Sequence, residues 1–153
     1  MQANEIDKPA VIEVLNRILE AELAGVVRYT HYSLMVYGYG RIPIVHWLRG
    51  QAEESLAHAQ EVGEYITTLG GHPSLAIGKL LEGEKHDIGA ILKESLAHEL
   101  KALGYYTDLL RLVEGRDIML EEYARQMVAA ESKHASEVDK MLRSPGDLKP
   151  FAM

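Results

Sequence analysis

The chain has 153 residues, the size of one ordinary domain, and is long enough to bury a core without covalent staples. It contains no cysteine, which excludes thiolate metal sites, redox pairs and disulfides, so any metal must be held by oxygen and imidazole. A net charge of −7 without a long lysine and arginine cluster argues against nucleic acid as the main partner and favours cations.

In chain order, the first residues carry neither a basic segment nor an apolar run, and nowhere do about 18 apolar residues follow one another. We therefore expect a cytoplasmic protein that does not enter membranes. Apolar residues recur at spacings of three and four over residues 8–37 and again over 44–69, which predicts two helices. The short connection 38–43, Gly-Tyr-Gly-Arg-Ile-Pro, forces these helices to lie antiparallel.

The second half of the chain has the same organisation. Gly70-Gly71-His72-Pro73 ends the second helix, and a connection of about 15 residues follows. Two more helices are expected over 87–113 and 116–142, separated only by Glu114-Gly115, whereas 144–153 contains two prolines and no helical period. The sequence thus predicts one all-α domain over 1–153, a four-helix bundle of two antiparallel hairpins joined by a long crossover.

An internal repeat relates the two hairpins. A shift of 77 positions carries Glu22 onto Glu99, Tyr29 onto Tyr106 and Glu54 onto Glu131. A histidine follows the second glutamate of each half, His58 or His134, and only these histidines break step, by one residue. Each half therefore supplies two glutamates and one histidine at nearly duplicated spacing.

The glutamates of this repeat lie on apolar helix faces. Glu22 shares its face with Leu15, Leu19 and Val26, and Glu99 and Glu131 lie on similar stripes. Isolated buried carboxylates are costly, so several in one core need a compensating charge. Two divalent ions supply it, and oxygen-rich coordination with one imidazole per metal suits iron or manganese. The expected ligands are Glu22, Glu54, His58, Glu99, Glu131 and His134.

Simpler interpretations exist for single residues. A lone glutamate on an apolar stripe is usually a snorkelling side chain, and only the duplicated spacing argues otherwise. Glu61 also shares a face with His58 and is an alternative to Glu54. Tyr29 and Tyr106 are either plain core aromatics or redox-active or ligand-bonding residues. His31, His46, His72, His86 and His98 lack this pairing with a carboxylate and are expected to be non-ligands.

Glutamate in the first helix, Glu and His in the second, glutamate in the third and Glu131-Ser-Lys-His134 in the fourth resemble bacterioferritin and its relatives over nearly the whole chain. The segments 15–23, 69–75 and 96–100 look like that family too. The resemblance implies a ferritin-like ferroxidase, in which two Fe²⁺ per chain are oxidised by O₂ or H₂O₂ and ferric mineral collects inside a hollow shell. It further implies that Glu54 and Glu131 bridge the two irons, while Glu22 with His58 and Glu99 with His134 are terminal ligands.

The sequence departs from that family at three points. The glutamate of the second helix precedes His58 by four residues instead of three, an offset that a rotamer change or a π-bulge would absorb. Leu56 or Ser55 stands where the family has its haem-ligating methionine, so haem is not expected. The family's short fifth helix has no counterpart, which favours a homododecamer like that of the DNA-protection-in-starvation (Dps) family over a 24-subunit shell.

Two other functions compete with iron oxidation and storage. A di-metal peroxidase or catalase would keep the same ligands and use them for peroxide or manganese chemistry. Manganese or zinc can also substitute for iron in a site with these ligands. A DNA-coating shell would need basic surface that the acidic composition does not provide. Iron oxidation is the function that the sequence favours.

Overall fold

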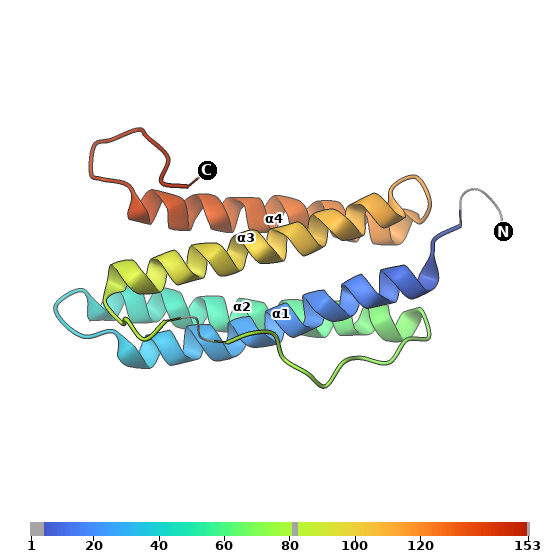
Figure 1. Ribbon diagram of the computed structural model, residues 1–153, viewed down its shortest axis with the longest axis horizontal. Helices are drawn as coiled ribbons and strands as arrows, with labels where there is room; N and C mark the ends of the chain where they lie inside the picture. The colour runs from blue at the N-terminus through green and yellow to red at the C-terminus, as the bar shows by residue number, and fades with distance from the viewer. Residues whose placement is uncertain (1–4, 81–82, 153) are drawn as a thin grey trace.

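A computed structural model describes residues 5–80 and 83–152 of the chain (Figure 1). Its four helices are α1 (Lys8–Met35), α2 (Arg41–Thr68), α3 (Ile88–Val113) and α4 (Ile118–Leu142). The described residues contain no strand, and the expected all-α architecture is confirmed. None of the described helices is long and apolar enough to cross a bilayer.

Aspartates begin three of the four helices. Asp7, Asp87 and Asp117 each accept a hydrogen bond from the backbone N–H three residues later, at 2.9 to 3.2 Å. This contact satisfies one of the donors that the first turn of a helix leaves unpaired. Helix α4 therefore starts at Ile118, two residues after the expected start, and Gly115 in the connection has a φ of +72°.

Helix α2 begins earlier than the sequence predicted. Pro43 was expected to belong to the connection, but the helix already starts at Arg41. Proline is tolerated in the first turn because its missing N–H would have no partner there. Helix α1 ends at Met35, two residues before the expected end, so the connection covers residues 36–40 instead of 38–43.

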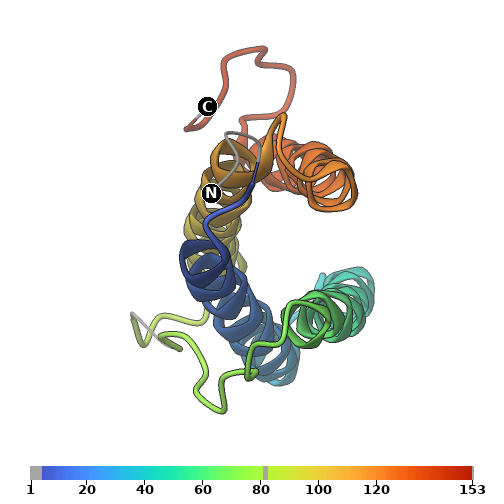
Figure 2. The same ribbon diagram turned by 90° about the vertical axis from the view of Figure 1, so that its right-hand side faces the viewer.

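The two hairpins pack through α1 and α3. Helix α1 contacts both α2 and α3, and α3 contacts α4, whereas the backbones of α2 and α4 stay farther apart. Viewed along the bundle, the four helices form an arc that is open between α2 and α4 (Figure 2). Side chains alone bridge this side, as where the Tyr65 and Tyr123 rings lie 4.4 Å apart.

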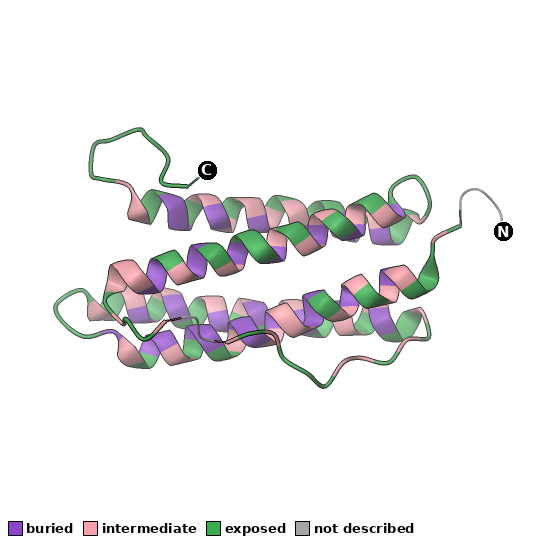
Figure 3. Cartoon of the chain, in the orientation of Figure 1, coloured by how far each residue is buried: buried purple, intermediate pink, exposed green. Residues whose placement is uncertain are grey.

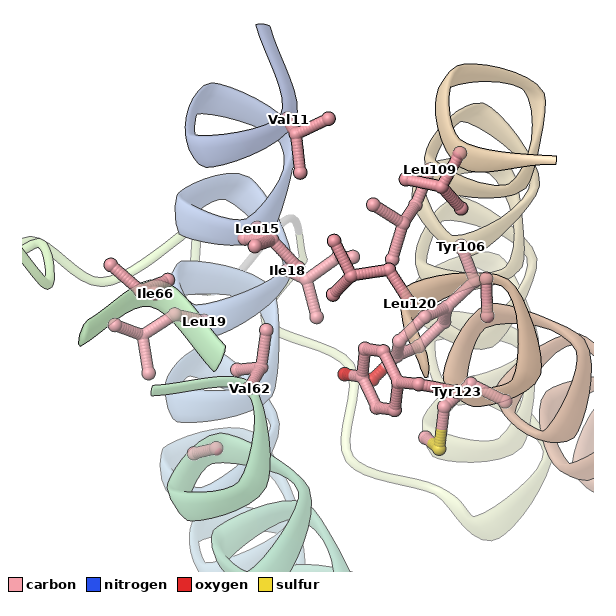
Figure 4. Close-up of a cluster of buried hydrophobic side chains, with 14 residues drawn as sticks. Val11, Leu15, Ile18, Leu19, Val62, Ile66, Tyr106, Leu109, Leu120 and Tyr123 are labelled. Atoms are coloured by element: carbon pink, nitrogen blue, oxygen red, sulfur yellow. The ribbon is translucent and has the colours of Figure 1, made fainter. Parts of the chain in front are cut away.

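Buried residues follow the inner stripe of each helix (Figure 3). At one end of the bundle all four helices contribute to an apolar cluster that includes Val11, Ile18, Ile66, Tyr106 and Leu120 (Figure 4). A second cluster, around Tyr29, Leu48 and Ile91, fills the other end. The middle of the bundle lies between these two clusters.

The crossover between α2 and α3 packs along α1. Asn16 donates to the carbonyl of His72 and accepts from the N–H of Ser74, at 3.2 and 2.8 Å. Farther along, Gly78 donates its N–H to the carbonyl of Glu20 and Arg28 donates to the carbonyl of Lys79. The long connection is thereby fixed to the outer side of the bundle.

Candidate metal centre

The predicted ligands come together in the middle of the bundle, one or two from each helix. Helix α1 supplies Glu22, α2 supplies Glu54 and His58, α3 supplies Glu99, and α4 supplies Glu131 and His134. Glu22, Glu99 and Glu131 are only 4%, 5% and 2% exposed, which confirms that these glutamates point inward. Amphipathic periodicity places them there, because each occupies the stripe that its helix buries.

Two groups of potential ligand atoms share one carboxylate. Glu22, His58 and Glu131 form the first group, and Glu99, Glu131 and His134 form the second, with atoms in each group within 4.8 Å of one another. His58 Nδ1 lies 3.5 Å from Glu22 Oε2 and 3.8 Å from Glu131 Oε1. Glu131 therefore lies between two adjacent candidate metal sites. Each site offers one imidazole nitrogen and several carboxylate oxygens.

Glu54 lies at the open edge of this cluster. Its Oε1 atom is 3.1 Å from His134 Nε2 and 3.8 Å from His58 Nε2, and its side chain is 39% exposed. Glu53 and Glu61 are exposed, whereas Ser55 is buried. Helix α2 runs as regular α-helix through this segment, so a π-bulge does not absorb the offset of one residue. Glu54 reaches both histidines from one turn before His58.

Tyrosines donate hydrogen bonds to the Glu22 and Glu99 carboxylates across the α1–α3 interface. The hydroxyl of Tyr106 donates to Glu22 Oε1 at 2.9 Å, and that of Tyr29 donates to Glu99 Oε1. Each tyrosine thus contacts the glutamate of the opposite hairpin instead of the one on its own helix. The pattern follows the sequence repeat, because the 77-residue shift exchanges the two pairs.

The buried carboxyls have strongly perturbed acidity. Burial, followed by the hydrogen bond and charge of Glu99, raises the pKa of Glu131 well above its usual range, and burial raises that of Glu22. Burial opposes ionisation of Glu99 too, but hydrogen bonds from Glu131 and Tyr29 outweigh it and lower the pKa. Burial would lower the pKa of His58, yet the hydrogen bond and charge of Glu22 raise it. Without a cation, burial therefore favours the protonated forms of Glu131 and Glu22.

This donor set fits divalent metal ions. Glu131 Oε2 is fully buried and has no hydrogen-bond partner among the described residues, which becomes costly once this carboxyl ionises. A cation between the two groups would supply the missing contact and replace the retained protons. Carboxylate oxygens with one imidazole per ion suit iron or manganese.

Within the described residues, these two groups are the only clusters of three or more histidine or acidic side chains with ligand atoms this close. His46 and His72 are exposed, and His31 and His86 pair with each other, their ring centroids 5.5 Å apart. His98 lines the same hollow as the six predicted residues. The sequence analysis classed His98 as a non-ligand and did not predict that it lines this hollow.

The chain matches the family model of the ferritin-like domain over residues 12–145. It belongs to this family. A ferritin-like relative, the bacterial ferritin of Neisseria meningitidis, is 28% identical over 94% of this chain and 90% of its own length. The bacterioferritin of Desulfovibrio desulfuricans is 29% identical over 88% of this chain and 75% of its own length.

Two solved structures share the ferritin-like fold. A ferritin-like diiron-carboxylate protein from Bacillus anthracis superposes with a TM-score of 0.84 at 24% identity, over 94% of this chain and all of that one. The dodecameric thioferritin of Bacteroides fragilis superposes with a TM-score of 0.83 at 25% identity, over 90% of this chain and 87% of the other. These likenesses agree with the family assignment and with the fold.

Proposed function

We propose that this protein is a ferroxidase of the cytoplasm that oxidises Fe²⁺ at a dinuclear centre and stores or detoxifies the ferric product. The observation that carries the proposal is the pair of ligand groups that share Glu131 between two buried sites. Four ionised glutamates carry a charge equal and opposite to that of two Fe²⁺ ions, so filling the centre removes the electrostatic cost of burying them.

In this proposal each residue has a defined role. Glu22 and His58 bind one iron, Glu99 and His134 bind the other, and Glu54 and Glu131 bridge them. Tyr29 and Tyr106 hold the Glu99 and Glu22 carboxylates in place by hydrogen bonds, as outer partners of metal ligands commonly do.

The reaction balances with either oxidant. Two Fe²⁺ ions lose one electron each, and H₂O₂ accepts both, so that its O–O bond breaks and two protons complete two water molecules. With O₂, the same two electrons and two protons yield H₂O₂. The protons that the buried carboxyls hold without metal leave when Fe²⁺ binds, which makes binding stronger as the pH rises.

Anaerobic titration with Fe²⁺, followed by spectroscopy, tests this function. The binding curve should break near two ions per chain, and admission of O₂ or H₂O₂ should then oxidise both. A break near one ion, or no saturable binding, would rule out the dinuclear centre. Parallel titrations with Mn²⁺ and Zn²⁺ would establish whether these ions occupy the same two sites.

The assembly that fits this function is a closed homododecamer, because ferric mineral is insoluble and a single bundle has no space to hold it. The similar thioferritin of Bacteroides fragilis is dodecameric. Tyr39, Ile42, Leu75, Ile118 and Leu148 are 83% to 111% exposed, apolar surface that contacts between subunits would cover. Light scattering should give about 205 kDa for twelve chains of 17.1 kDa. A stable monomer or dimer would contradict the cage.

A further inference from the structure

A polar pocket opens on the outer side of the bundle, between α1, α3 and the crossover. Four cationic side chains line it, those of Arg17, Arg28, Lys79 and Lys101, together with the carboxylates of Glu20 and Glu94. This pocket lies on the α1–α3 side, whereas Glu54 and His134 of the metal centre are partly exposed on the α2–α4 side. The pocket and the partly exposed edge of the metal centre therefore lie on different sides of the bundle.

His98 belongs to both. Its side chain lines the outer pocket and also the hollow formed by the six predicted ligands. The ring stands edge-on to Tyr29, with centroids 6.1 Å apart, and Tyr29 donates a hydrogen bond to Glu99. The His98 imidazole is therefore part of the wall of both the outer pocket and the metal centre.

Small residues lie next to His98 and in the wall of the outer pocket. A Cβ atom at Gly25 would lie 3.1 Å from His98 Nε2 and 2.8 Å from Ser55 Oγ, closer than side chains normally pack. Ala21, Ala24 and Ala97 form further parts of the pocket wall. Because Gly25 has no side chain, the His98 imidazole and the Ser55 hydroxyl pack directly against the backbone of α1.

Charge distinguishes the two approaches. The outer pocket carries more cationic than anionic side chains, which disfavours entry of a divalent cation. The opposite approach presents the Glu54 carboxylate and the His134 imidazole, both ligand types for iron. A neutral molecule is neither attracted by the acidic side nor repelled by the basic side.

We propose that the small neutral oxidant, O₂ or H₂O₂, reaches the centre through the outer pocket past His98, while Fe²⁺ enters between α2 and α4. This inference rests on the proposed ferroxidase function and assigns to that centre separate entries for its two substrates. His98 acts in it as a gating residue and binds no metal.

Metal-free protein gives the first test. Diethyl pyrocarbonate, a neutral reagent that acylates histidine, should modify His98 from the outer pocket, and mass spectrometry locates the product. Ala97→Phe narrows the pocket mouth at an exposed helical position and should protect His98 at least about fivefold. The matched control is Ala129→Phe, at an exposed alanine of α4 outside the pocket. Equal modification of His98 in both variants would overturn the route.

Stopped-flow mixing gives the second test. Protein loaded anaerobically with Fe²⁺ is mixed with O₂ or H₂O₂, and Ala97→Phe should slow oxidation about tenfold with at least one of them, because entry becomes the slow step. His98→Ala should speed oxidation when the oxidant is limiting. The rate and stoichiometry of anaerobic Co²⁺ binding should stay unchanged in Ala97→Phe. Slower Co²⁺ binding by Ala97→Phe, or unchanged oxidation with both oxidants, would refute the inference. Failure of the unmodified protein to oxidise iron would instead refute the proposed function.

Discussion

Glu54 differs in spacing from its counterpart in the repeat, because Glu131 precedes His134 by three residues. It precedes His58 by four residues and lies near both histidines, half-exposed at the edge of the centre. Neighbouring positions cannot take its role, because Glu53 faces solvent and the Ser55 hydroxyl neutralises no positive charge. If Glu54 bridges the two irons, then among residues 53–55 only its replacement should impair iron oxidation.

Replacing Glu54 by alanine should reduce the initial rate of ferrous oxidation by about tenfold or more, the usual cost of weakening a metal site. Glu53→Ala and Ser55→Ala serve as controls and should stay active, and all three variants should assemble normally. Stopped-flow absorbance and light scattering measure the two properties. Normal oxidation by Glu54→Ala together with an inactive Glu61→Ala would show that Glu61 is the carboxylate in use.

The raised pKa of Glu131 predicts how the stability of the metal-free protein depends on pH. Its pKa is raised in the folded protein, so the unfolded chain releases this proton first as the pH rises. The metal-free protein should therefore lose stability from about pH 4.3, where an unfolded glutamate ionises, up through neutral pH. Glu131→Gln keeps the shape of the side chain but cannot ionise. Its free energy of unfolding, measured by denaturant melts at several pH values, should therefore fall less as the pH rises. The same variant should bind Co²⁺ at least about tenfold more weakly. Unchanged pH dependence would contradict the assigned protonation.

The sequence predicted which residues face the core but not all of their partners. Helical periodicity placed Glu22, Glu99 and Glu131 inward, because one stripe of each helix must be buried. The exchanged contacts of Tyr29 and Tyr106 depend on how α1 and α3 are staggered, which periodicity along one helix does not contain. The position of His98 between pocket and centre likewise depends on the packing of three helices.

At the scale of elements, helix lengths and order were predictable and their ends less so. The early start of α2 at Arg41 was missed because Pro43 was taken as a helix breaker, although proline fits a first turn. Residues 144–152 form no helix, as expected. Their docking was not predicted, since it depends on the buried Asp139, which periodicity alone identifies only as a charged residue on an apolar stripe.

Asp139 fastens this last segment to α4. Its carboxylate accepts the N–H groups of Ala152 and Phe151 at 2.8 and 3.1 Å and an Arg143 N–H at 2.8 Å. The Ala152 N–H contributes most to lowering the pKa of Asp139, so the contact stabilises the fold above the unfolded pKa and is lost as the pH falls through the folded one.

Asp139→Asn should release residues 144–152, because an amide replaces one acceptor oxygen with a donor. Amide hydrogen exchange at Phe151 and Ala152 should accelerate at pH 7, and the difference from the unmodified protein should shrink below about pH 4. The exposed Asp147, which accepts from the N–H of Lys149, provides the control Asp147→Asn, expected to leave these two amides protected. Equal exchange in both variants would mean that other contacts hold the segment.

At the scale of the whole molecule, the candidate metal centre lies between the two hairpins on the side where the backbones of α2 and α4 do not meet. Helices α2 and α4 are bridged only by side chains, among them Glu54 with His134 and His58 with Glu131. Ions bound there would link all four helices at mid-bundle and relieve the repulsion among the carboxyls. The open α2–α4 side should then be the part of the bundle that responds most to metal.

Metal should therefore raise the melting temperature and slow amide hydrogen exchange mainly in α2 and α4. Free metal at a hundredfold excess over its dissociation constant stabilises a folded protein by about 2.7 kcal/mol per site. For a chain of this size that corresponds to about 5 to 10 °C. Calorimetry of stripped and Co²⁺-refilled protein measures the shift, and hydrogen exchange should show the largest added protection in α2 and α4. Glu131→Gln, which lacks the shared carboxylate, should show little of either effect. A melting temperature that stays the same after stripping and refilling would mean that the four glutamates do not hold metal in this fold.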